Sequence, residues 1–167
     1  LSLGVNQLGG LLCAQPNAPR PDMQIYINPI TYHPAPQGGR RPILPDRESG
    51  FIFSFNACRP YSTGRIEITG PDWRQPPRID GNYLSDQRDL DDVVVMARLI
   101  GKMQDSATIK GLLAAPCETG LSAMSNQAII DDFRERSGTV FHPCGTCRMG
   151  PDAAHAVVDP SLRVSLM

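Results

Sequence analysis

One short segment of this sequence gathers the residue types that most often carry chemistry. Residues 141–150 read FHPCGTCRMG, so one histidine, two cysteines and one arginine fall within seven residues. Pro143 fixes the backbone dihedral φ directly after His142, and Gly145 and Thr146 separate the two cysteines. An imidazole, two thiols and a guanidinium this close together could bind a metal, exchange disulfides or move a proton.

Metal binding and thiol exchange both depend on Cys144 and Cys147, which form a CxxC pair. With His142 they offer three ligands, but structural zinc takes four, and no second CxxC or HxxxH pair occurs. A redox CxxC pair places its first thiolate at a helix N-terminus, and no helix pattern follows here. We therefore expect no metal and interpret both cysteines as small packing residues. The alternative function is a non-catalytic CxxC module that binds a metal or senses redox state.

Proton transfer depends on His142. Histidine has the side chain whose ordinary pKa lies nearest neutrality, so it can take a proton from an alcohol and return it. A buried imidazole that only satisfies local hydrogen bonds is the structural alternative. Arg148 is open to two interpretations, because it could meet an anionic group or bond to nearby carbonyl oxygens.

Hydrophobic periodicity predicts the elements that must position this segment. Alternating apolar residues indicate strands, and apolar residues at helical spacing indicate helices. The predicted strands are 23–30, 51–56, 65–69, 78–83 and 139–141, and the predicted helices are 89–103 and 126–136. The strands 51–56 and 65–69 follow each other closely, which favours an antiparallel pair. The expected fold class is α+β, an antiparallel sheet flanked by helices, with residues 1–20 as an irregular N-terminal segment and 21–167 as one domain.

The two helices carry recognisable boundary signals. Ser85 or Asp86 can cap the first helix, and Ser125 can cap the second. Gly138 follows the second helix closely, as expected at a C-terminal end. The first helix is interpreted with its apolar face toward the core, and that face is formed by Leu90, Val93, Val94, Ala97, Ile100 and Gly101.

Composition narrows the class of protein. The chain has 167 residues and a formal net charge of -1, which argues against a binder of nucleic acid or of an anionic membrane. No apolar run reaches the ~18 residues of a membrane span. Sixteen prolines and 15 glycines exclude a helical bundle. Five cysteines, an odd and low count, predict reduced and mostly buried thiols in a cytoplasmic protein. The first residue is Leu1 rather than Met, so we expect a piece of a longer protein.

Four stretches together resemble one known family. FHPCGTCRMG, followed by AVVDPSLRV at 156–164, resembles the C-terminal signature of the glucose–methanol–choline (GMC) family of flavin-dependent oxidoreductases, roughly HPxGTCRMG and AVVDPxLRV. PDMQI at 21–25 resembles the family's PDxQ strand, and RPYSTGR at 59–65 resembles its RPxSxG turn. Residues 77–89 resemble its PxIxxNYLxxxxD stretch. The wording HPCGT is especially similar to that of choline dehydrogenases and related alcohol dehydrogenases.

The resemblance implies a function. Members have an FAD-binding half, which begins with GxGxxG, and a substrate-binding half like residues 21–167, an FAD-linked reductase C-terminal domain. In such enzymes a primary alcohol loses its hydroxyl proton to a base while its carbon gives hydride to the flavin. By motif match, His142 is implied to be the active-site base. Choline, as one such alcohol, would call for an aromatic cage, and Tyr61, Trp73 and Tyr83 are the candidates.

The sequence also departs from the family pattern. No GxGxxG occurs in it, and the family's DxSxxP stretch, with a second active-site His or Asn beyond it, is not found after residue 164. We therefore expect this chain to be a substrate-domain fragment whose partner is the FAD-binding half of the same polypeptide. Alone, it is expected neither to hold FAD firmly nor to turn over alcohols.

Overall fold

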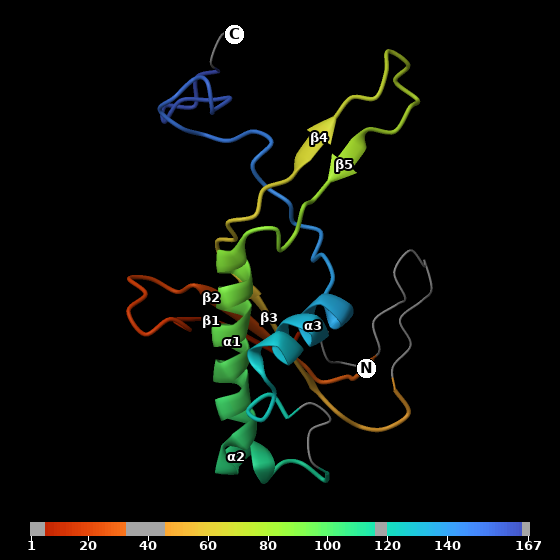
Figure 1. Ribbon diagram of the computed structural model, residues 1–167, viewed down its shortest axis with the longest axis vertical. Coiled ribbons are helices and arrows are strands. Elements are labelled where there is room, and N and C mark those ends of the chain that lie inside the picture. The colour runs from red at the N-terminus through yellow and green to blue at the C-terminus, as the bar shows by residue number, and fades with distance from the viewer. Residues whose placement is uncertain (1–5, 33–45, 116–119, 165–167) are drawn as a thin grey trace. The chain divides into compact units, whose positions relative to one another are not determined.

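A computed structural model describes residues 6–32, 46–115 and 120–164 of the chain. The chain divides into two compact units, Leu1–Ser137 and Gly138–Met167. The first unit contains every named helix and strand, and its core elements are an antiparallel sheet, β1 to β3, and two helices, α1 and α3 (Figure 1). Among the described residues, no helix is both long enough and apolar enough to cross a membrane.

The main sheet has three antiparallel strands in the order β1 (Leu8–Leu12), β2 (Met23–Asn28) and β3 (Ile52–Ala57). The predicted alternation of the central strand is confirmed at its start, where Met23 and Ile25 are buried, but not at its end, where Asn28 is buried and Ile27 is only half-buried. Ile25 stands opposite Phe55 of β3, whose ring contacts that of Phe133 in α3 with 5.5 Å between the centroids. The sheet therefore meets the helices through one apolar face.

The expectation that residues 1–20 are irregular is wrong, because they contain β1. Gly9 and Gly10 give this strand little intrinsic β-propensity, and Leu8 is largely exposed, so the local sequence lacks the usual signal. The strand persists because it is paired along β2 and because Asp22 holds the connection. Its carboxylate accepts the backbone N–H groups of Ala14 at 2.6 Å and of residue 15 at 3.0 Å.

The predicted pairing of the strands at 51–56 and 65–69 is also wrong. β3 pairs with β2, which lies across a long intervening segment, whereas β4 (Arg65–Glu67) pairs with β5 (Arg78–Asp80) in a separate antiparallel ribbon. Closeness in sequence suggested the wrong partner. The turn between β3 and β4 is tied to a helix rather than shaped as a hairpin connection, as described below.

The first helix, α1 (Gln87–Asp105), confirms the prediction and extends it by two residues at each end. Asp86 is the N-cap, and its carboxylate accepts the backbone N–H of Arg88 at 2.9 Å. α1 packs against β3 and α3. Its buried residues are Asp89, Val93, Met96, Ala97, Ile100 and Gly101. A short helix, α2 (Ala107–Lys110), follows it without having been predicted.

The second predicted helix is confirmed with both of its bounds as α3 (Asn126–Arg136). Ser125 is its N-cap, and its hydroxyl accepts the N–H of Ala128 at 3.1 Å. The loop before α3 is fastened to α1 by Arg98, whose guanidinium donates to the carbonyl oxygens of residues 121 and 124 at 2.7 Å each. The core of the first unit comprises Met23, Ile25, Val93, Met96, Ala97, Ile100, Leu121 and Ile129.

Candidate functional site

The segment with the predicted active-site histidine lies in the second unit, where the two halves of the signature fold onto each other. Met149 and Val158 form a parallel β-bridge, and Val158 forms an antiparallel bridge with Val164. Gly150 donates its N–H to the carbonyl of Val158 at 3.0 Å, and residue 157 donates to the carbonyl of residue 148 at 2.8 Å. The stretch after His142 is thus held by backbone bonds to AVVDPSLRV.

A capped turn closes the second half of the signature. The carboxylate of Asp159 accepts the backbone N–H groups of Ser161 at 2.8 Å and of Arg163 at 2.9 Å, so it caps a turn at Asp159–Pro160. The N–H of Asp159 donates in return to the carbonyl of Arg163 at 2.9 Å. Leu162 takes the left-handed conformation with φ of 63° that this tight return requires.

His142 itself lies exposed on a loop and not at the end of a strand. The predicted strand 139–141 is wrong, because Phe141 has a φ of 60°, which a strand does not accommodate. The N–H of Phe141 donates to the hydroxyl of Thr139 at 3.1 Å, so a side chain takes the bond that a neighbouring strand would otherwise provide. The imidazole is open to a small molecule, and the alternative of a buried structural histidine does not hold within the described residues.

The cysteines are less buried than the sequence suggested. Cys144 and Cys147 are both exposed free thiols, as is Cys13, while Cys58 is half-buried. Gly145 between the first two has a φ of 108°, so the pair lies in a tight turn and not in a helix. The interpretation as packing residues is therefore wrong for the second unit as described. Cys117 lies outside the described residues.

No metal-ligand group is formed in the parts of the chain that the structure describes, since no three His, Cys, Asp or Glu side chains gather there. His155 instead pairs with Asp152, with 2.7 Å between Nδ1 and Oδ2. The hydrogen bonds from His155 and from the N–H of Ala154 lower the pKa of Asp152. His33, which has no assigned role in the sequence analysis, lies outside the described residues.

A buried carboxylate that the sequence analysis did not single out organises the first unit. Asp89, in the first turn of α1, is 4% exposed and accepts the backbone N–H groups of Tyr61 at 2.7 Å and Ser62 at 2.8 Å. The hydroxyl of Ser62 also donates to it, and the N–H of Asp86 donates to the Ser62 oxygen at 3.1 Å. The RPYSTG turn is thereby bound to the start of the helix. The signal was present, because Asp89 is the acid that ends the PxIxxNYLxxxxD stretch.

Burial and hydrogen bonding act on the Asp89 carboxyl in opposite directions. Burial alone raises its pKa, because it removes water from the charged form. The hydrogen bonds from the Ser62 hydroxyl and from the two backbone N–H groups outweigh this effect and leave the pKa of Asp89 below its ordinary value. Asp89 is therefore ionised near neutral pH and acts as a fixed acceptor.

Two of the three aromatic residues considered for a choline cage, Tyr61 and Trp73, are engaged with arginines. The guanidinium of Arg88 lies over the ring of Tyr61, 4.0 Å from its centroid, and is held there by Asp86. The side-chain and backbone hydrogen bonds from Arg88 lower the pKa of Asp86 to about 2. Trp73 carries Arg74 over its ring at 5.9 Å and lies outside both strands of the ribbon. These rings already bind cations of the chain itself.

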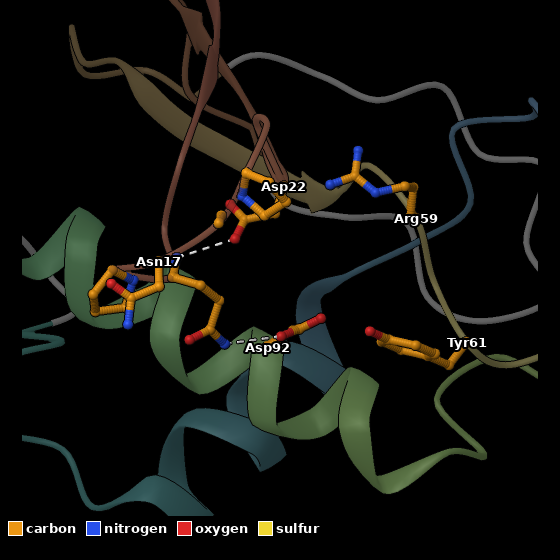
Figure 2. Close-up of a pocket in the computed structure, with 9 residues that line it drawn as sticks. Asn17, Asp22, Arg59, Tyr61 and Asp92 are labelled. Carbon is orange, nitrogen blue, oxygen red and sulfur yellow. Dashed lines mark hydrogen bonds between the residues drawn. The ribbon is translucent and has the colours of Figure 1, made fainter.

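A pocket of about 400 Å³ opens beside the β1–β2 connection (Figure 2). Tyr61 and Arg59 lie on one side of it and Asn17 on the other, with the carboxylates of Asp22 and Asp92 between them (Figure 2). Asp22 is committed to the N–H groups of the turn, and Asp92 accepts the side-chain amide of residue 15 at 3.1 Å. Both carboxylates of the pocket therefore accept hydrogen bonds from the β1–β2 connection.

The pocket of the first unit does not suit the pyrophosphate of FAD. A pyrophosphate needs clustered N–H donors, as in a glycine-rich loop at a helix N-terminus, or cations. The pocket presents two carboxylates beside one arginine, Arg59, so it would repel a pyrophosphate group. The loop around His142 is exposed.

Comparison with known proteins identifies the family to which this chain belongs. The family model described as GMC oxidoreductase matches residues 60–167, which is more than half of the chain. The chain therefore belongs to the GMC oxidoreductase family, whose members depend on FAD. The match includes the RPYSTG turn, the ribbon, both long helices and the whole second unit.

Named relatives agree with this assignment. The chain is 32% identical to the alcohol dehydrogenase [acceptor] of Pseudomonas putida over 98% of this chain and 28% of that protein. It is 27% identical to human mitochondrial choline dehydrogenase over 95% of this chain and 26% of that protein. The solved structure of pyridoxine 4-oxidase from Mesorbium loti matches with a TM-score of 0.71 and 25% identity, covering 96% of this chain and 30% of that one.

These matches confirm the α+β fold class and the predicted family. The chain spans only about a quarter to a third of the length of the relatives it matches.

Proposed function

We propose that this chain is the substrate-binding part of an FAD-dependent enzyme that oxidises a primary alcohol, a class that includes choline. One observation carries the proposal: the His142 loop leads directly into a signature whose two halves are joined by β-bridges at Val158. The names of the relatives given above refer to alcohols, choline and pyridoxine, which fits an enzyme acting on CH–OH groups.

His142 is the residue that we propose takes the proton of the substrate hydroxyl. An imidazole accepts the hydroxyl proton of an alcohol best when the carbon that carries this hydroxyl is oxidised at the same time. The family's FAD would supply that oxidising chemistry. Pro143 and the left-handed backbone at Phe141 restrict the chain on both sides of His142. That restriction favours one direction for the ring, which proton transfer requires.

The remainder of the same polypeptide is the partner implied by this function. The sequence has no GxGxxG, and the acidic pocket of the first unit suits no pyrophosphate, so the FAD must be bound chiefly elsewhere. The active site then forms only when the His142 loop meets a bound flavin. For this reason we propose that the 167-residue chain by itself is inactive.

The proposal is tested with His142→Ala and His142→Gln in the complete polypeptide that carries these residues. We expect turnover of a primary alcohol to fall by on the order of 10² or more, while bound FAD stays at the wild-type level. His155→Ala is the matched control, because His155 lies in the same unit and pairs with Asp152 instead. Wild-type turnover in both His142 variants would remove this residue from the mechanism.

A further inference from the structure

The two-stranded ribbon of β4 and β5 has one apolar and one charged face. Ile66 and Ile79 are directly opposite in the antiparallel register, so their side chains share a face. The neighbouring register pairs are Arg65 with Asp80 and Glu67 with Arg78, which point to the other face. Glu67 there contacts both arginines, at 3.4 Å from Arg65 and 3.9 Å from Arg78.

The apolar face is not covered by the described residues of the first unit. Ile66 is 55% exposed, Ile79 is 70% exposed, and Ile68, two residues after Ile66, is 90% exposed. We name these three side chains the ribbon face. A two-stranded ribbon in water is marginally stable unless an apolar face packs against something else. The ribbon face therefore has the properties of a surface with a missing partner.

The ribbon is presented by a rigid base. Figure 1 shows β4 and β5 extending beyond the first turn of α1, where Asp89 holds the backbone of the preceding turn. At Gly64, directly before β4, a Cβ would lie 2.0 Å from the carbonyl oxygen of Asp80, so only glycine permits the strands to close here. The base of the ribbon is thus fixed by the hydrogen bonds to Asp89 and by the close approach of the two strands at Gly64.

We propose that the ribbon face is the docking surface for the part of the same polypeptide that lies outside residues 1–167. This inference rests on the proposed function, because it names the partner that completes the active site. The matched relatives are more than three times as long as the region they share with this chain, so a covalently attached partner of that size is expected. A tethered partner meets the ribbon at a high effective concentration, which favours it over a second copy of the chain.

The test uses the complete polypeptide with the photoreactive residue p-benzoylphenylalanine at position 79. After irradiation, peptide mass spectrometry locates the cross-linked residue. We expect cross-links to residues outside this chain, within one polypeptide. The same replacement at Arg78, the adjacent residue on the charged face, should give a several times lower yield to the same region. Position 66 is the second test site, used if the protein changed at 79 elutes as an aggregate.

Three outcomes would overturn the inference: cross-links that join two polypeptides, cross-links only within the 167-residue chain, or equal yields from positions 79 and 78. The reading of the experiment does not depend on catalysis. Cross-links to the expected region in an enzyme whose turnover survives His142→Ala would keep the docking surface and reject the proposed base. If His142→Ala abolishes turnover but position 79 gives no such cross-links, the proposed base is kept and the docking surface is rejected.

Discussion

Asp89 shows how one carboxylate can define the geometry of a turn. It is buried, and it accepts two backbone N–H groups and one hydroxyl from the RPYSTG turn. A carboxylate can satisfy all three donors, because both of its oxygens are acceptors. An amide has only one acceptor oxygen, and its NH₂ group would face a donor.

We predict that Asp89→Asn lowers the free energy of unfolding by about 2–4 kcal/mol, because a buried donor loses its charged acceptor. Urea denaturation of the purified protein measures this change. Asp91→Asn is the control, since Asp91 lies in the same helix turn but is exposed, and its effect should stay within about 0.5 kcal/mol.

The same substitution has a defined pH dependence. The folded-state pKa of Asp89 lies below its ordinary value of 3.8, so its stabilising effect is fully present above about pH 4 and is lost as the pH falls through the folded-state pKa. The stability difference between wild type and Asp89→Asn should therefore shrink as the pH is lowered below 3.8. A difference that is the same at pH 7 and in that acidic range would contradict the assignment.

His142 illustrates the limit of residue-level inference from sequence. Its assignment came from the HPCGTCRMG signature, and no periodicity could have revealed that Phe141 would adopt a left-handed backbone. Asp89 illustrates the opposite case. It ends the PxIxxNYLxxxxD stretch, but its importance arises from donors 27 and 28 residues away in the sequence, which no local pattern shows.

At the scale of elements, α1 connects the ribbon to α3. Asp89 in its first turn binds the segment before β4, and Arg98 further along binds the loop before α3. The guanidinium donates to the carbonyl oxygens of residues 121 and 124 and to the side chain of Asn126 at 3.0 Å. One helix therefore positions two segments that the sequence separates widely.

We predict that Arg98→Ala costs about 2–3 kcal/mol of unfolding free energy and speeds amide hydrogen exchange at residues 120–126, because several carbonyl acceptors lose a charged donor together. Arg98→Lys should recover part of the loss, since an ammonium cannot reach the same set of acceptors. Lys102→Ala, an exposed site on the same helix, serves as the control. Exchange rates at 120–126 that do not change in Arg98→Ala would refute this role.

Local signals predicted the elements well where they were self-sufficient. A serine cap, an apolar repeat and a following glycine were enough to give both ends of α3. Strand pairing could not be predicted in this way, because β3 pairs with β2 across a long connection. β1 likewise depends on its hydrogen-bonded pairing with β2. Those choices depend on tertiary contacts, which a single sequence does not display.

At the scale of the whole molecule, the proposed role as a substrate-binding part leaves the binding of FAD to the rest of a longer polypeptide. We predict that the purified 167-residue chain carries no flavin absorbance and shows no alcohol-dependent dye reduction. The reason is that the pyrophosphate of FAD finds clustered donors neither in the acidic pocket nor in the sequence, which has no GxGxxG. Added FAD should remain removable by gel filtration.

The complete polypeptide, purified in the same way, is the control and should retain its flavin. Stoichiometric FAD together with alcohol-dependent turnover in the 167-residue chain would show that these residues suffice, against the proposal.

The hydrogen bonds around Asp89 also have a consequence for how this region tolerates change during evolution. Two of its donors are backbone groups, so the identity of the side chain at position 61 is not read by the carboxylate. Position 62 is constrained, because only its hydroxyl both donates to Asp89 and accepts from the N–H of Asp86. Replacing the side chain of Tyr61 should therefore leave the hydrogen bonds of this turn to Asp89 intact. Ser62 and Asp89, in contrast, should change only together.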